Sequence, residues 1–104
     1  MKALPILVLG LGLALAQSDK KPDPAAGKLV FEEKCSECHE SDTEETKIGP
    51  GLKGVKEGKL PSGKRANHDN ILEILTEGRD EMPPFKDVLT DKQKDDVIAY
   101  VLTL

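Results

Sequence analysis

The 104-residue chain has no tryptophan, only two cysteines, and only three aromatic side chains, Phe31, Phe85 and Tyr100. A domain of this size buries little more than about 60% of its extended surface, so few aromatic residues leave a thin core. Small exported domains usually compensate with disulfides. Here Cys35 and Cys38 lie too close in sequence for a bridge between them to close a stabilising loop. We therefore expect one domain whose core is completed by something other than cross-links.

Long apolar runs are also missing, except at the start, where residues 1–16 read "MKALPILVLGLGLALA". This run begins with a lysine, ends in an Ala-Leu-Ala cleavage pattern, and is shorter than the roughly 20 residues of a membrane span. We predict a signal peptide over 1–16, a flexible lead-in over 17–23 and one domain over 24–104. The mature protein would then be periplasmic, or at least extracytoplasmic, with no integral membrane span. It would be membrane-associated if the leader stays uncleaved.

A surplus of positive charge is absent as well, because 15 Lys and Arg face 19 Asp and Glu, giving a net charge of −4. Loss of Lys2 with the leader makes the mature charge 14 − 19 = −5. Nucleic-acid-binding proteins carry basic patches, and anionic membranes attract basic segments. The acidic balance therefore argues against nucleic acid and anionic lipid as partners. It is compatible with docking onto a basic protein face.

Three helices are predicted, and no segment alternates long enough to be a convincing strand. The first runs over 24–38, because Asp23 can cap it and Pro24 suits its first turn; Leu29 and Phe31 should be among its apolar contacts. The second follows Asn70, with Glu73 completing a capping box. We therefore expect an all-α fold.

The ends of the second and third helices also have sequence signals. Gly78 should end the second helix in a glycine C-cap. The third begins at Thr90, with Gln93 completing its capping box, and continues to the end of the chain. Its core-facing positions follow a helical spacing and are Val97, Val101 and Leu104.

Both cysteines belong to one motif, "CSECH", in which Cys35, Cys38 and His39 stand at positions i, i+3 and i+4. These positions share one face of a helical turn. C-x-x-C-H is the attachment signature of c-type haem. Two thiols on one face can add to the two vinyl groups of a porphyrin, and the imidazole can bind the iron. The motif predicts one covalently bound haem c.

Three other interpretations of the motif compete with haem. A structural zinc site needs four nitrogen or sulfur ligands, and the chain adds only the distant His68. A thioredoxin-like dithiol belongs beside a βαβ pattern, which the sequence lacks. A structural disulfide between the two cysteines would add little stability. Haem attachment is the interpretation that uses all three side chains together.

The sixth iron position decides what a haem protein does. His/Met ligation raises the potential and serves electron transfer, whereas an open position permits ligand binding or catalysis. Met82 is the one methionine of the mature chain and lies in "MPPF", where Pro83 and Pro84 stiffen the loop. His68 lies in strongly polar surroundings, which favours a solvated or helix-capping histidine. We predict Met82 as the sixth ligand.

The quoted motifs together resemble the class I monohaem cytochrome c family, and in particular short bacterial c-type cytochromes. The landmarks occur in order and cover nearly all of the mature chain: Gly27 and Phe31, "CSECH", "GPGLKG" at 49–54, "MPPF" at 82–85, and the closing "LTDKQKDDVIAYVLTL". The resemblance implies a cytochrome c fold. Three to four helices would wrap around one covalent haem, with the N- and C-terminal helices packed together.

The resemblance also implies residue roles. Cys35 and Cys38 would carry the thioether links, and His39 and Met82 would be the axial ligands. The Pro50 carbonyl would accept a hydrogen bond from the His39 ring. Gly27 would let the first helix cross closely over the last, near Tyr100. Three loop cations could pair with the haem propionates, although charged loop residues are usually solvated. They are Lys53, Lys64 and Arg65.

The expected function is single-electron transfer by a soluble protein that is not itself an enzyme. Its partners would be redox proteins such as an oxidase, reductase or dehydrogenase, met transiently. One alternative is a cytochrome c subunit of a larger respiratory, dehydrogenase or sulfur-oxidising complex. Another is a haem protein that binds ligands or acts as a peroxidase.

Overall fold

The computed structural model describes residues 21–104, so the predicted signal peptide lies outside the described part of the chain. The elements are α2 (Pro24–Lys34), the 3₁₀ helix η2 (Val55–Glu57), α3 (His68–Glu77) and α4 (Asp91–Val101). In residues 21–104, β-pairing is limited to the isolated bridges Lys59–Arg65 and Arg79–Met82. The predicted all-α class is confirmed. Over the same residues, no helix is long and apolar enough to cross a membrane.

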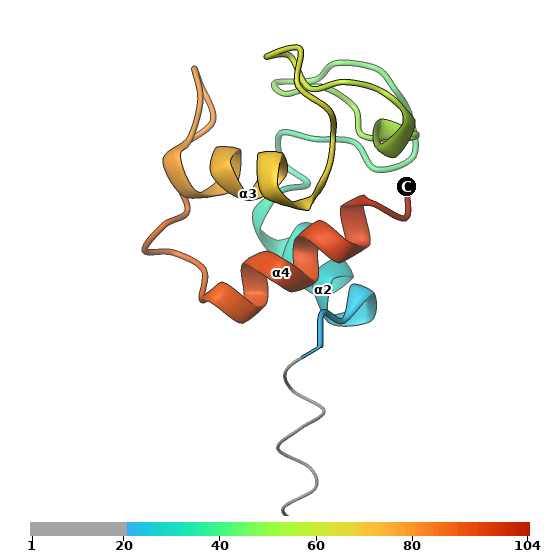
Figure 1. The fold of residues 1–104 in the computed structure, drawn as a ribbon. Helices are drawn as coiled ribbons and strands as arrows, with labels where there is room; N and C mark the ends of the chain where they lie inside the picture. The colour runs from blue at the N-terminus through green and yellow to red at the C-terminus, as the bar shows by residue number, and fades with distance from the viewer. Residues whose placement is uncertain (1–20) are drawn as a thin grey trace, which may run out of the picture.

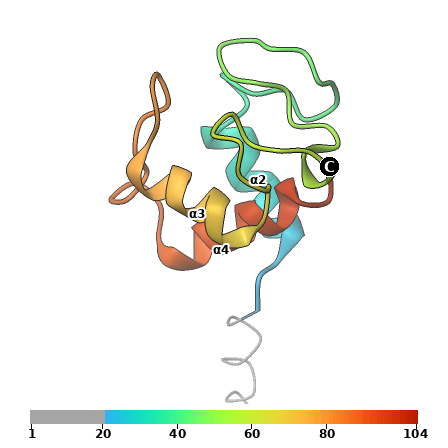
Figure 2. The ribbon, with the colours of Figure 1, turned by 45° about the horizontal axis from the view of Figure 1, so that its top comes forward.

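Helices α2 and α4 pack across each other, and α3 lies against α4 (Figure 1). The long connection from α2 to α3 gathers beside the C-terminal end of the chain, as both views show (Figures 1 and 2). A backbone hydrogen bond joins them, because the Gly54 N–H donates to the Leu104 carbonyl at 2.9 Å. The connection is thereby tied to the helical core.

Helix α2 begins as predicted, with the Asp23 side chain accepting a hydrogen bond from the Ala25 N–H at 3.0 Å and Pro24 as the first helical residue. It ends at Lys34, four residues before the predicted end. The prediction that Leu29 contacts the core is wrong, because this side chain is 67% exposed. The buried face is instead Gly27, Val30 and Phe31, at positions i, i+3 and i+4, which turns Leu29 to solvent.

The first and last helices meet backbone to backbone at Gly27. A Cβ atom on this glycine would overlap the Asp96 carbonyl and lie 2.9 Å from the Val97 Cα. One turn further along each helix, Phe31 and Tyr100 pack edge to face with their ring centroids 5.5 Å apart. The predicted close packing of these helices is confirmed, with its tightest point at Asp96.

Helix α3 begins at His68, earlier than predicted. Its N-cap is Asn67, whose side chain accepts from the Asn70 N–H at 2.9 Å, so the predicted cap at Asn70 is wrong. The predicted partner in that capping box, Glu73, instead pairs with Lys64 at 3.2 Å. The predicted end at Gly78 is confirmed, with a backbone φ of 78°.

Helix α4 begins as the sequence indicates. Thr90 is the N-cap, and the reciprocal bonds of the capping box join it to Gln93 at 2.9 and 3.1 Å. The helix ends at Val101 rather than at the chain terminus. Val97 and Val101 are buried as predicted, while Leu104 lies beyond the helix and is half-buried.

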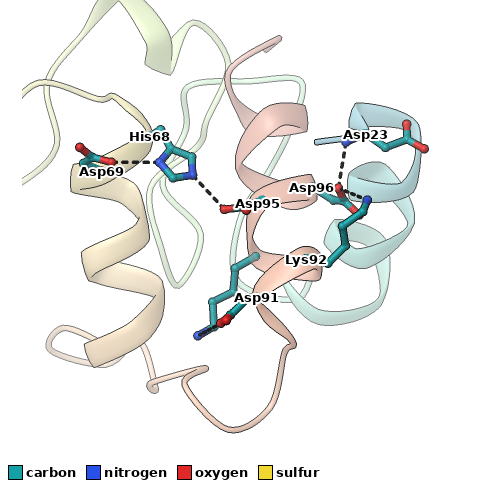
Figure 3. A network of polar contacts seen from close by, with 8 residues as sticks. Asp23, His68, Asp69, Asp91, Lys92, Asp95 and Asp96 are labelled. Atoms are coloured by element: carbon teal, nitrogen blue, oxygen red, sulfur yellow. Dashed lines mark hydrogen bonds and ion pairs between the residues drawn. The ribbon is translucent and has the colours of Figure 1, made fainter. Parts of the chain in front are cut away.

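Asp96 is a buried carboxylate at the crossing of α2 and α4. It accepts hydrogen bonds from the Asp23 N–H at 2.8 Å and from the Lys92 ammonium at 2.8 and 3.0 Å (Figure 3). These bonds compensate for the lost hydration of the charge. They also fix the start of α2 against α4.

Replacing Asp96 by alanine is expected to destabilise the protein by roughly 2–3 kcal/mol, because the Asp23 N–H and the Lys92 ammonium both lose their acceptor. Urea unfolding followed by circular dichroism measures the change. Glu33→Ala removes an exposed carboxylate from α2 and should leave the midpoint nearly unchanged. Equal midpoints for the two variants would contradict this role of Asp96.

Candidate haem site

The C-x-x-C-H motif forms a separate turn directly after α2. The N–H groups of Cys38 and His39 both donate to the Cys35 carbonyl, at 3.1 and 2.9 Å. The regular hydrogen bonding of α2 stops before this turn. The Ser36 N–H donates to the Phe31 carbonyl, five residues back, at 2.9 Å. The Ser36 carbonyl accepts a hydrogen bond from the Lys47 ammonium, also at 2.9 Å. The motif side chains therefore share one helical turn, as the spacing predicts, although that turn is not part of α2.

Neither Cys35 nor Cys38 forms a disulfide in the described structure. Burial, and secondarily the neighbouring Cys38, raises the pKa of the Cys35 thiol to about 11. Dithiols that catalyse redox exchange have lowered pKa values, because the thiolate is the nucleophile. Cys35 has the opposite character, which disfavours the thioredoxin-like interpretation.

The His39 ring is oriented by the backbone of the following loop. Its Nδ1 lies 2.8 Å from the Pro50 carbonyl, and since a carbonyl only accepts, Nδ1 carries the hydrogen. The lone pair of Nε2 is then available to a metal, and no hydrogen bond within residues 21–104 engages it. A Cβ atom on Gly49 would lie 2.5 Å from Cε1 and 3.1 Å from Nε2 of His39, so a side chain at this position would collide with the imidazole ring. The predicted bond from His39 to Pro50 is confirmed.

Met82 lies in a tight turn after α3. Arg79 and Met82 exchange two backbone hydrogen bonds, at 3.0 and 2.8 Å, around Asp80 with its positive φ of 53°. The turn packs against the end of α3, where a Cβ on Gly78 would lie 2.8 Å from the Met82 carbonyl oxygen. The Phe85 N–H then bonds to the α3 residue Leu75 at 2.7 Å. Met82 is thus half-buried on a loop that the backbone fixes at both sides.

His68 has a different place and different partners. It is the first residue of α3, with Nδ1 3.1 Å from Asp69 and Nε2 2.9 Å from Asp95 on α4. Its side chain is 44% exposed, which agrees with a polar residue at a helix start. Both ring nitrogens are engaged, so His68 offers no free lone pair to a metal. The partner on α4 had no signal in the sequence, because 27 residues separate the pair.

The residues present fit an iron porphyrin. The available donors are two thiols, one oriented imidazole and one thioether, which are the groups that attach and ligate haem. Half-buried apolar side chains pack around the core and offer an apolar surface: Leu52, Val55, Ile71, Leu72, Phe85 and Leu102. Cys35 and Met82 pack against that same core. Residues 21–104 contain no group of three or more His, Cys, Asp or Glu side chains arranged for a metal ion.

Comparisons with known proteins find similarity to c-type cytochromes. The family model described as cytochrome c oxidase, cbb3-type, subunit III matches residues 22–101. Cytochrome c6 of Rippkaea orientalis is 36% identical over 80 residues, covering 77% of this chain and 69% of that protein. Cytochrome c6 of Synechocystis sp. is 34% identical over 101 residues, covering 96% of this chain and 82% of that protein.

A solved structure of a similar protein supports the fold. The crystal structure of cytochrome c6 from the diatom Phaeodactylum tricornutum superposes with a TM-score of 0.62 and 29% sequence identity, covering 78% of this chain and 92% of that one. The observed helices therefore form the cytochrome c fold that the sequence predicts. The chain carries a single covalently bound haem c and transfers electrons. It belongs to the class I monohaem c-type cytochromes, together with its cytochrome c6 relatives.

Proposed function

We propose that this chain is a soluble electron carrier in which Cys35 and Cys38 form the thioether links and His39 and Met82 ligate the iron. The observation that carries the proposal is the His39 ring, whose Nδ1–H is held by Pro50 at 2.8 Å while Nε2 stays open. Bound haem supplies a one-electron ferric–ferrous couple. The protein contributes ligand orientation, an apolar surrounding and a contact edge for partners.

The residues around the two proposed ligands favour electron transfer with little rearrangement. The Pro50 carbonyl fixes the tautomer of His39 and increases the basicity of its ligating nitrogen. The paired backbone bonds between Arg79 and Met82 hold the thioether in place without a helix. A ligand on such a fixed loop can remain bound in both oxidation states, so the structure changes little when an electron passes.

The partners are proposed to be redox proteins that bind transiently, because electron-transfer interfaces are small. The net charge of −4 favours partners with a basic docking face. The leader-like residues 1–16 support a proposed location in the periplasm or an equivalent compartment. The chain is proposed to carry electrons for enzymes and not to catalyse a reaction itself.

A second candidate is a cytochrome c subunit of a larger respiratory complex. The description of the matching family model, an oxidase subunit, favours it. Purification from the native membrane and periplasmic fractions separates the two candidates. A carrier elutes alone at the mass of one chain plus haem, whereas a subunit elutes with its complex.

Addition of carbon monoxide to the ferrous protein tests whether the sixth position is closed. With Met82 bound to the iron, the visible spectrum should remain largely unchanged, because the iron has no vacant coordination position for carbon monoxide. Protein denatured in urea, in which Met82 is released, provides the positive control. Ready carbon monoxide binding by the native protein would contradict the carrier proposal and favour a ligand-binding or peroxidase function.

A further inference from the structure

His68 joins two helices through one side chain. Its Nδ1 lies 3.1 Å from an Asp69 carboxylate oxygen on α3, and its Nε2 lies 2.9 Å from an Asp95 carboxylate oxygen on α4 (Figure 3). Asp69 is 95% exposed and belongs to the same helix, so it contributes nothing between helices. Of these two bonds, only the bond to Asp95 runs between α3 and α4.

The geometry favours a protonated ring. An ionised carboxylate only accepts hydrogen bonds, so both bonds form together only when both ring nitrogens donate, as they do in an imidazolium; a neutral ring has one N–H and can keep one of the two bonds. The bond to Asp95, and then the bond to Asp69, raises the pKa of His68 above its ordinary value, against a smaller lowering by burial. An imidazolium at a helix N-terminus is disfavoured by the helix dipole, and the two carboxylates offset this.

Other charged side chains on α4 and on the loop before α3 have their own partners or are exposed. On α4, Asp91 pairs with Lys94 at 3.8 Å, and Asp96 pairs with Lys92. On the loop before α3, the Arg65 carbonyl accepts from the Asn70 side chain, and the Arg65 side chain is exposed. The protonation of His68 is therefore governed by Asp69 and Asp95.

Movement of α3 would reach the Met82 loop directly. Leu75 is the buried side chain of this helix, and Ile71 and Leu72 also pack against the core. The bond from His68 to Asp95 adds a polar contact with α4 at the start of the helix. The end of the helix contacts the loop through Gly78 and through the bond from the Phe85 N–H to Leu75. A shift of α3 would therefore displace the turn that carries Met82.

We propose that His68 is a positioning residue: its protonated ring ties α3 to α4 through a charge-assisted bond to Asp95 and so holds the Met82 loop, and loss of the proton leaves a weaker bond without the charge. The inference rests on the proposed ligation by Met82. It makes retention of the sixth ligand dependent on pH through a residue that does not touch the haem.

The direction of the pH effect follows from the raised pKa. The stabilisation is fully present below the ordinary histidine pKa of about 6.5. It is lost as the pH rises through the higher pKa of the folded protein. The Met82 loop should therefore open more readily in mildly alkaline than in mildly acidic solution.

The test uses the ferric holoprotein in a urea titration at about pH 5.5 and about pH 8.5. The methionine–iron absorption band reports the Met82 loop, and far-ultraviolet circular dichroism reports the helices. In the wild type, the equilibrium constant for loss of the band should rise by about two- to five-fold at the higher pH, as expected for a half-exposed ion pair. The circular dichroism midpoint should change less, because only α3 is loosened.

Three variants isolate the interhelical bond. In His68→Gln and in Asp95→Asn, the equilibrium constant for loss of the methionine–iron band should no longer differ between the two pH values. Asp69→Asn is the matched control: it removes the bond within α3 but keeps the tie to α4, so the pH difference should persist. Band loss with the same pH dependence in His68→Gln as in the wild type would overturn the inference, and so would a band that always disappears together with the helices.

Failure of the underlying ligation looks different. If the wild type lacks the methionine–iron band at both pH values without urea, Met82 is not the ligand, and the proposed function and this inference both fail. If the band is present but indifferent to His68 and Asp95, the ligation stands and the positioning role alone is wrong.

Discussion

Replacement of Met82 by alanine is expected to produce the largest functional change, by opening the sixth iron position. The reduction potential should fall by on the order of 0.1 V or more, since axial ligands shift haem potentials over a span of about 0.8 V. The methionine–iron absorption band should disappear, and the ferrous protein should bind carbon monoxide. Spectroelectrochemical titration and a carbon monoxide difference spectrum measure these effects.

A matched control for this variant lies in the same loop region. Val88 is an apolar side chain that is 54% exposed, so Val88→Ala should leave the potential, the absorption band and the closed sixth position unchanged. Survival of both the potential and the band in Met82→Ala would contradict the assignment, because another residue would then have to be the ligand.

Replacement of Gly27 by alanine should have the largest effect on the fold. The added methyl group would overlap the Asp96 carbonyl and crowd the Val97 Cα, both of which belong to backbone that cannot rotate away. Separating α2 from α4 would also weaken the Phe31–Tyr100 contact. We expect a loss of roughly 3 kcal/mol or more, at the upper end for overpacked sites. Chemical denaturation of the holoprotein and the yield of haem-loaded protein report it.

Gly58→Ala provides the control for a glycine substitution in general. A Cβ at this position would have one neighbour, the Val55 carbonyl oxygen at 3.8 Å, and the backbone φ of −113° suits any residue. Its stability should therefore stay close to that of the wild type. If Gly27→Ala were equally stable, the close approach of α2 and α4 would not depend on the missing side chain.

Local signals in the sequence predicted much of this structure. Asp23 with Pro24, Thr90 with Gln93, and Gly78 each determine a helix end through bonds to residues a few positions away. Such bonds form within one turn, so a short stretch of sequence contains the necessary information. The same holds for the turn that gathers the motif cysteines and histidine.

Some errors occurred where distant residues decide the local structure. Helix α2 ends early because Lys47 binds the Ser36 carbonyl, a contact over eleven residues. The predicted start of α3 was wrong for a local reason: Asn67 caps the helix through the Asn70 N–H, and the Asn70 side chain bonds to the Arg65 carbonyl instead. The tie between Asp96 and Asp23 spans 73 residues and left no pattern in the sequence. Tertiary contacts of this kind override local preferences.

The donors of the candidate site could be proposed from the sequence, but their supporting contacts could not. The spacing of the motif indicated which side chains are candidates to attach and ligate haem. The glycine that clears space for His39, and the paired backbone bonds that fix the Met82 turn, emerge only from the folded chain. In the proposed ligation, these contacts would orient the imidazole and fix the loop that carries the thioether.

Intact mass combined with a visible spectrum tests the central claim most directly, on protein exported and matured together with its haem-attachment machinery. The account predicts a mass equal to the chain plus one haem, resistant to denaturation, and a red protein whose spectrum changes reversibly on reduction. A colourless, stably folded protein from that same preparation, with Cys35 and Cys38 free or joined to each other, would contradict it.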